Sequence, residues 1–133
     1  MRRITDVRLP RRPGSHDPAG LHWLTLDDQG LITASGPMPR SGAMAGESWH
    51  GDTLSRRGTD LQINGGLGLA FTELAEGDLP RILELLDLLW RDGVEAIAPT
   101  LVTCAVKPLR QSLAVLRQAR ERHQSSRCQL LGA

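Results

Sequence analysis

The sequence predicts an α/β fold, because short apolar strands alternate with two amphipathic helices along its second half. Strands are expected around residues 60–64, 94–102 and 128–132, with one helix in each of the two intervals between them. The middle strand is almost continuously apolar, which is typical of a strand covered on both faces. Strands joined by helices in this way pair in parallel, because each helix returns the chain to the same end of the sheet.

Start and stop signals bound the first of these helices. Asp78 is suited to the N-cap position, and Pro80 fits the first turn, where a missing N–H is tolerated. The helix is expected to run through Arg91 and to end at Gly93, which suits the left-handed conformation after a helix. Apolar residues recur between these limits at helical spacing, namely Leu79, Ile82, Leu83, Leu86, Leu89 and Trp90.

The second helix is expected to begin at Pro108. Its apolar residues form one stripe, made of Leu109, Leu113 and Leu116, and the other positions are mostly Arg and Gln. This pattern predicts a helix that packs one side against the sheet and leaves the other in solvent.

The first half of the sequence is expected to form β structure. The alternation of residue types predicts three short strands, at residues 4–9, 21–26 and 31–34. The last two form a hairpin across a turn at 27–30. Residues 35–47 are rich in Gly, Pro, Ser and Ala and are expected to form an irregular linker. We therefore expect two domains, over residues 1–54 and 55–133.

Composition argues against nucleic-acid and membrane partners. The formal net charge is +1, and no apolar run approaches the ~20 residues that span a membrane. Five arginines near the start are expected to lie on a solvated strand edge and loop, namely Arg2, Arg3, Arg8, Arg11 and Arg12. Cys104 and Cys128 have neither metal-binding nor disulfide spacing and are expected to be small buried thiols. A cytoplasmic protein is the simplest interpretation.

Two side-chain amides stand at the end of the first strand of the second half. Gln62 and Asn64 are two residues apart, so a regular strand would place them on one face, with Leu61 and Ile63 on the other. They lie at the carboxyl end of the strand, where barrel enzymes assemble their active sites. The amides either hold the loop that follows or line a binding site, and the residues alone leave both interpretations open.

Three segments extend this observation along the chain. They are residues 58–68 (containing Asp60-Leu61-Gln62-Ile63-Asn64-Gly65-Gly66), residues 93–103 (containing Gly93-Val94 and Pro99-Thr100-Leu101-Val102-Thr103), and Leu130-Leu131-Gly132. Their order and spacing resemble the first three barrel strands of the N-acetylglucosamine-6-phosphate deacetylases, a branch of the metal-dependent amidohydrolases. The resemblance extends over nearly the whole chain, because the strands of the first half fit the small β-sandwich that precedes the barrel in that family.

The resemblance implies a fold, an activity and partners. The fold would be the first strands and helices of a (β/α)8 TIM barrel, preceded by part of a small β-sandwich domain. The family hydrolyses the N-acetyl amide of N-acetylglucosamine 6-phosphate to glucosamine 6-phosphate and acetate, with water activated by a divalent metal, zinc. Its small-molecule partner is therefore an amino-sugar phosphate, and the full-length family implies a homodimer.

The resemblance also implies roles for Gln62 and Asn64. Many amidohydrolases carry His-x-His at this strand end, which grips a metal, whereas neutral amides bind zinc weakly. Gln62 and Asn64 are thus expected to line a one-metal active site without ligating the metal. The family's His-x-Glu-Gly-Pro segment follows its third strand, and its catalytic Asp comes later. We therefore expect an N-terminal portion of a deacetylase, with no catalytic residue or metal ligand of its own and no activity alone.

The four histidines, His16, His22, His50 and His123, have no ligand spacing and are expected to be surface residues.

Two further interpretations of the chain remain open. The chain could instead be a non-catalytic α/β module that binds a partner or self-associates through exposed strand edges. It could also belong to another amidohydrolase that cleaves a cyclic amide, although the absence of His-x-His argues against the two-metal members of that group.

Overall fold

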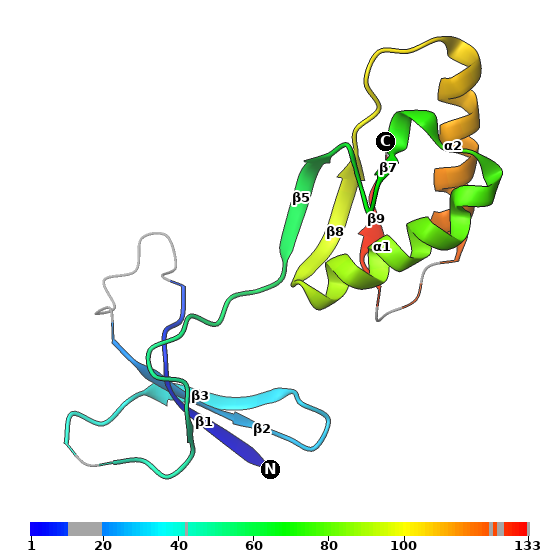
Figure 1. The fold of residues 1–133 in the computed structure, drawn as a ribbon. Coiled ribbons are helices and arrows are strands. Elements are labelled where there is room, and N and C mark those ends of the chain that lie inside the picture. Colours follow the sequence, from blue (N-terminus) through cyan, green and yellow to red (C-terminus); the bar gives the residue numbers. More distant parts are fainter. Residues whose placement is uncertain (11–19, 42, 123, 125–126, 133) are drawn as a thin grey trace. The chain divides into compact units, whose positions relative to one another are not determined.

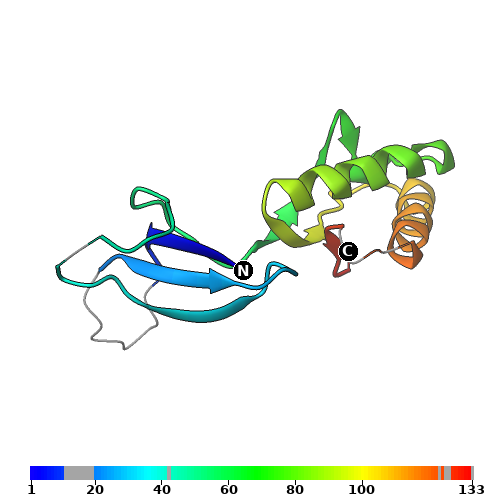
Figure 2. The same ribbon diagram turned by 90° about the horizontal axis from the view of Figure 1, so that it is seen from below.

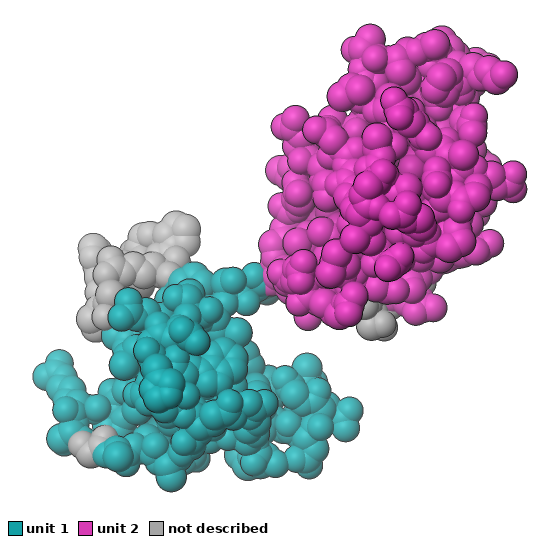
Figure 3. Space-filling view, in the orientation of Figure 1, with its two compact units in different colours: residues 1–56 teal, residues 57–133 magenta. Residues whose placement is uncertain are grey.

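The computed structural model describes residues 1–10, 20–41, 43–122, 124 and 127–132. The chain divides into two compact units, unit 1 over Met1–Arg56 and unit 2 over Arg57–Ala133 (Figure 3). The division thus follows Arg56, whereas the sequence placed the boundary after Leu54. The predictions for Arg11, Arg12, His16 and His123 concern residues outside the described ranges.

Unit 1 is a four-stranded sheet with the strand order β3-β2-β1-β4. Its strands are β1 (Arg2–Val7), β2 (His22–Leu26), β3 (Ile32–Pro37) and β4 (Glu47–Ser48). Neighbouring strands are antiparallel except β1 and β4, which are parallel. The core of the unit is formed by Ile4, Val7 and Leu24, with Trp49 and Leu54 among the residues packed against it. The sheet provides three of the expected strands and one that the sequence did not predict, β4.

The limits predicted for the linker at residues 35–47 are wrong at both ends. Strand β3 continues through Pro37 into the segment that was expected to be irregular, and β4 begins at Glu47. Gly36 explains the first difference, because a Cβ atom there would lie 2.9 Å from the ring of Trp23. The absence of a side chain lets the indole cover this strand, and composition alone does not reveal that contact.

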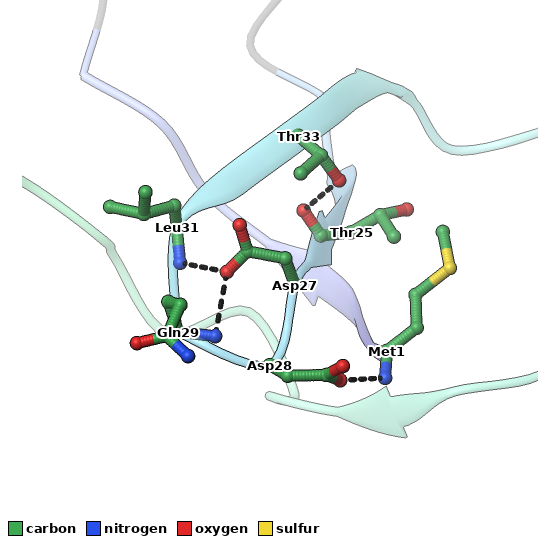
Figure 4. A network of polar contacts seen from close by, with 7 residues as sticks. All are labelled: Met1, Thr25, Asp27, Asp28, Gln29, Leu31 and Thr33. Atoms are coloured by element: carbon green, nitrogen blue, oxygen red, sulfur yellow. Dashed lines mark hydrogen bonds and ion pairs between the residues drawn. The ribbon is translucent and has the colours of Figure 1, made fainter.

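Side chains shape the predicted hairpin between β2 and β3 (Figure 4). The Oδ1 atom of Asp27 accepts hydrogen bonds from the backbone N–H groups of Gln29 and Leu31, each at 2.9 Å. Gly30 then adopts a φ of 79°, which closes the turn at little steric cost. Asp28 contacts the terminal amino group of Met1 at 2.7 Å. The turn is therefore encoded locally, as the sequence indicated.

Unit 2 contains a parallel sheet and two helices (Figures 1 and 2). The sheet has the order β5-β8-β9, formed by β5 (Gly58–Ile63), β8 (Val94–Pro99) and β9 (Gln129–Leu130). A small antiparallel pair, β6 (Gly65–Gly66) and β7 (Leu69–Ala70), follows β5. Two 3-10 turns, η1 (Phe71–Glu73) and η2 (Glu76–Asp78), lead into helix α1 (Leu79–Arg91), and helix α2 (Val106–Glu121) connects β8 to β9.

The predicted limits of α1 are confirmed. Asp78 precedes the helix and Pro80 lies in its first turn, while Gly93 adopts a φ of 87° just after the helix. The Asp78 carboxylate accepts a hydrogen bond from the N–H of Ala75 at 2.8 Å, so it holds the preceding turn rather than capping the helix. No helix in the described part of the chain is long and apolar enough to cross a membrane.

Helix α2 differs from its prediction in two respects. It begins at Val106, so Pro108 lies inside the first turn, where no intrahelical N–H donor is needed. Leu113 is 40% exposed rather than part of the buried stripe. The buried position is taken by Ser112, whose hydroxyl accepts a hydrogen bond from the N–H of Leu74 at 3.2 Å. The inward side of α2 therefore combines this hydrogen bond with the buried side chains of Val115, Leu116 and Ala119.

Strands β8 and β9 are shorter than expected. Strand β8 ends at Pro99, and the N–H of Val102 donates to the Thr72 hydroxyl at 3.0 Å instead of continuing a strand ladder. Strand β9 contains only Gln129 and Leu130. The sequence predicted continuation to residues 102 and 132 because both segments are apolar, and apolarity does not reveal where pairing stops.

Both helices share one core with the sheet. The cluster joins α1 (through Ile82 and Leu86) and α2 (through Leu116) to Ile97 of β8 and Leu130 of β9. Because the helices also contact each other, they cover the same side of the sheet. This arrangement leaves β5 and β9 as the two outer strands.

The two cysteines differ in burial. Cys128 is fully buried in this core, as expected, and burial, with a smaller contribution from the charge of Asp60, raises the pKa of its thiol to about 11. Cys104 is only half-buried, so the expectation of a buried thiol is wrong there. It lies in the loop that leaves β8, outside the core cluster.

An ion pair connects α1 to the segment that enters β9. The Nε and NH2 atoms of Arg127 donate to the two carboxylate oxygens of Asp87 at 2.6 and 3.0 Å. These hydrogen bonds hold the pKa of the Asp87 carboxyl below its ordinary value of 3.8. The Asp87 side chain remains 45% exposed, so solvent screening limits what the pair contributes to stability.

Asp87→Asn is expected to lower the free energy of unfolding of unit 2 by about 0.5–1 kcal/mol at neutral pH. Because the pKa of Asp87 is lower in the folded protein than in the unfolded chain, its carboxylate stabilises the fold fully above pH 3.8. That contribution is lost as the pH falls through the folded-state pKa. Urea unfolding should therefore show a smaller difference in the free energy of unfolding between the original protein and Asp87→Asn at roughly pH 2 than at neutral pH. Glu84→Gln, an exposed change on the same helix, is the control; a difference independent of pH would contradict the assignment.

Candidate functional site

The candidate site lies at the carboxyl end of β5. Gln62 is the next-to-last residue of this strand, and Asn64 follows directly after it. Asp60 is paired with Ile97 and Ile63 with Pro99, so the register between β5 and β8 shifts between these two pairs. A strand with one extra residue at such a point forms a β-bulge, which redirects the side chains beside it. The Oδ1 atom of Asp60 accepts a hydrogen bond from the N–H of Gln62 at 2.9 Å and so supports the bulge.

The bulge changes the expected alternation of side chains. Ile63 packs against the core of unit 2, but Leu61 is 75% exposed and does not join that core. Leu61 and Ile63, which were expected to lie on one face, therefore differ in burial. The physical reason is the irregular ladder, because a strict two-residue period requires a regular strand.

Gln62 and Asn64 present their side chains to solvent. Both residues are exposed, and we find no hydrogen bond from either side-chain amide within the described ranges. The loop that follows is held by the main chain instead, since the N–H of Phe71 donates to the Asn64 carbonyl at 2.8 Å. Arg81 also donates to the carbonyl of Leu67. The interpretation that the two amides only hold this loop therefore gains no support.

Two glycines shape the backbone beside the amides. Gly65 has a φ of 152°, and a Cβ atom there would lie 2.0 Å from the carbonyl oxygen of Leu69. At Gly66 a Cβ atom would lie 2.6 Å from the side chain of Leu85 in α1. The first glycine allows the close β6–β7 pairing, and the second lets this pair lie against α1. The Gly-Gly sequence is therefore a tight strand exit.

The end of β8 lies next to the end of β5. The two strands are parallel neighbours, and the N–H of Thr100 donates to the Ile63 carbonyl at 2.8 Å. The Thr72 hydroxyl then binds the N–H of Val102. Two of the sequence segments that carried the resemblance, the one ending β5 and the one ending β8, thus meet at one edge of the sheet.

These residues do not make a metal site by themselves. In the described ranges, no three His, Cys, Asp or Glu side chains are grouped so that they could hold an ion. The donors that are present, Gln62 and Asn64, are neutral amides, which are poor zinc ligands. His50 is exposed and His22 is half-buried, and both belong to unit 1. A zinc ion therefore does not fit the residues that the structure describes.

Comparison with known proteins gives one informative result. No family model matches the sequence, and no curated protein matches it. Among solved structures, the chain resembles the crystal structure of N-acetylglucosamine-6-phosphate deacetylase from Pasteurella multocida, with a TM-score of 0.57 and 19% sequence identity. The match covers 98% of this chain and 32% of that protein, so the chain spans about a third of its length. The fold of this chain is thus similar to a part of that deacetylase.

Proposed function

We propose that this chain is the N-terminal portion of a metal-dependent amidohydrolase that deacetylates N-acetylglucosamine 6-phosphate. One observation carries the proposal: the fold likeness to a deacetylase extends over 98% of the chain. The Gln62-x-Asn64 strand end then supplies exposed amides at the edge where barrel enzymes hold their substrates. In this proposal the complete enzyme is a cytoplasmic homodimer.

The topology of unit 2 agrees with the start of a barrel. Its strands follow one another in the order β5-β8-β9, and both helices cover one side of the sheet. A barrel continues in one direction with all helices outside. We therefore propose that unit 2 is the start of a (β/α)8 barrel and that unit 1 is part of the accompanying β-sandwich.

The proposed role of the two amides is to bind and orient the reactants. An amide N–H can donate to the acetyl carbonyl or to a phosphate oxygen, and an amide oxygen can accept from the attacking water. Their exposed position leaves these groups available for a ligand. Because the described residues do not fit a zinc ion, we assign the metal ligands and the catalytic carboxylate to residues outside this sequence. The chain alone is then inactive.

A joined enzyme tests these roles. This chain would replace the matching part of the Pasteurella multocida deacetylase, and acetate release from N-acetylglucosamine 6-phosphate would be measured. Gln62→Ala with Asn64→Ala is expected to lower kcat/KM by about 10- to 100-fold, as losses of residues that orient a metal site typically do. Glu84→Gln, an exposed change on helix α1 away from this strand end, is the control. Unchanged turnover and unchanged metal content in the double variant would contradict the assignment.

A further inference from the structure

The bulge in β5 adjoins the candidate site. Leu61 and Gln62 of β5 stand opposite one residue of β8, Ala98, between the paired residues that flank them. Directly after the bulge the N–H of Thr100 donates to the Ile63 carbonyl at 2.8 Å, so the pairing of the strands resumes at once. Bulges are frequent at barrel rims and beside active sites, where they redirect a side chain. The direction of the Gln62 side chain therefore depends on this bulge.

A side chain of the same strand supports the bulge. The Oδ1 atom of Asp60 accepts a hydrogen bond from the N–H of Gln62 at 2.9 Å. An aspartate that binds the backbone two residues ahead in this way fixes the local turn of its own chain. Leu61 and Gln62 are both exposed, so they add little packing to the bulge. The Asp60 carboxylate is thus the side-chain contact that fixes the backbone at Gln62.

An ion pair does not explain the carboxylate of Asp60. Asp60 is half-buried, and no ion pair involves it among the residues that the structure describes. Its charge contributes to the raised pKa of the buried Cys128 thiol, so the carboxylate lies near the core of unit 2. Partial burial of a charge without a cation is unfavourable, and a hydrogen bond reduces that cost. The contact that this carboxylate makes is therefore the one to Gln62.

We propose that Asp60 is a positioning residue of the candidate site, whose carboxylate holds the β5 bulge so that the Gln62 amide faces the substrate. This inference rests on the proposed function, in which Gln62 orients the reactants. Asp60 acts through the backbone N–H of Gln62 and does not touch the reactants. Asparagine keeps an Oδ1 acceptor at this position, alanine removes it, and glutamate moves the acceptor by one methylene group while keeping the charge.

Hydrogen exchange in the 133-residue chain tests the positioning step without any activity. Asp60→Ala is expected to speed exchange of the Gln62 amide by about two- to tenfold, as loss of one hydrogen bond does, and to shift its side-chain NH2 resonances. Asp60→Glu is expected to act in the same direction, which keeps the test decisive if Asp60→Ala does not fold. Asp60→Asn and the matched control Asp92→Ala, an exposed aspartate after α1, are expected to leave the Gln62 amide unchanged.

A double-mutant cycle in the joined enzyme tests the link to the reaction. Asp60→Ala is expected to lower kcat/KM about tenfold when Gln62 is present, as loss of a supporting contact typically does. It should have less than about a twofold effect in the Gln62→Ala variant, because Asp60 acts through that side chain. Asp60→Asn should restore most of the activity that Asp60→Ala loses.

Two outcomes would overturn the proposal. One is an equal loss of kcat/KM with and without the Gln62 side chain, which would mean that Asp60 supports only the fold. The other is a Gln62 amide whose exchange and resonances are the same in Asp60→Ala as in the original chain. A folded, metal-loaded joined enzyme that releases no acetate with Asp60 in place would contradict the proposed function instead. The exchange measurements would then still decide whether Asp60 positions Gln62.

Discussion

Gly65→Ala is expected to lower the free energy of unfolding of unit 2 by at least about 3 kcal/mol. Gly65 has a φ of 152°, a conformation that residues with a Cβ atom rarely adopt. The added methyl group would lie 2.0 Å from the carbonyl oxygen of Leu69, and this neighbour is backbone rather than a flexible side chain. The β6–β7 pair must therefore open, and the loop after Asn64 moves with it.

Urea unfolding followed by far-ultraviolet circular dichroism measures this effect, because both helices of the structure lie in unit 2. Gly77→Ala is the matched control, since nothing lies within 4 Å of a Cβ atom there. That variant should unfold within about 1 kcal/mol of the original protein. If Gly65→Ala were equally mild, the close pairing of β6 with β7 would be wrong.

Phe71→Ala is expected to destabilise unit 2 by about 3–5 kcal/mol, because it removes a large side chain from a packed interior. Phe71 is fully buried in the core between α1 and α2, and it is the one phenylalanine of the sequence. Its N–H also donates to the Asn64 carbonyl, so its position fixes the loop beside the candidate site. Loss of the ring should therefore disturb both the core and the orientation of Asn64.

The same unfolding experiment, with amide hydrogen exchange, separates these two effects. Leu67→Ala is the control, because Leu67 lies in the same loop but is 37% exposed. We expect it to cost less than about 1 kcal/mol. Faster exchange of the Phe71 amide should accompany Phe71→Ala. A loss of stability no larger than that of the control would contradict the position of Phe71 at the centre of this core.

Local signals made α1 predictable, whereas long-range contacts decided α2. Pro80 and Gly93 constrain the backbone through their own covalent structure, so their neighbours matter little. The inward side of α2 includes Ser112, whose hydroxyl accepts a hydrogen bond from the N–H of Leu74, beside the buried Val115 and Ala119. Apolar periodicity does not identify a polar residue at a buried position. Leu113 was therefore assigned to the buried side of α2 in place of Ser112.

The candidate site was predictable in its position but not in its detailed geometry. The sequence placed Gln62 and Asn64 at a strand end because Gly65 interrupts the apolar alternation there. It did not predict the bulge, which depends on the Asp60 carboxylate accepting from the backbone of its own strand. The sequence also did not predict the β6–β7 pair. In the structure, Leu67 and Gly68 have positive φ values and form the two-residue hairpin turn between these strands.

Acetate release by the joined enzyme tests the central claim most directly, namely that this chain forms the first part of a deacetylase barrel. With the chain in place of the matching segment of the Pasteurella multocida deacetylase, we predict hydrolysis of N-acetylglucosamine 6-phosphate at a rate that depends on Gln62 and Asn64. Cooperative unfolding and metal content establish that the joined enzyme is folded and loaded. A folded, loaded joined enzyme that releases no acetate, or that cleaves a cyclic amide instead, would contradict the claim.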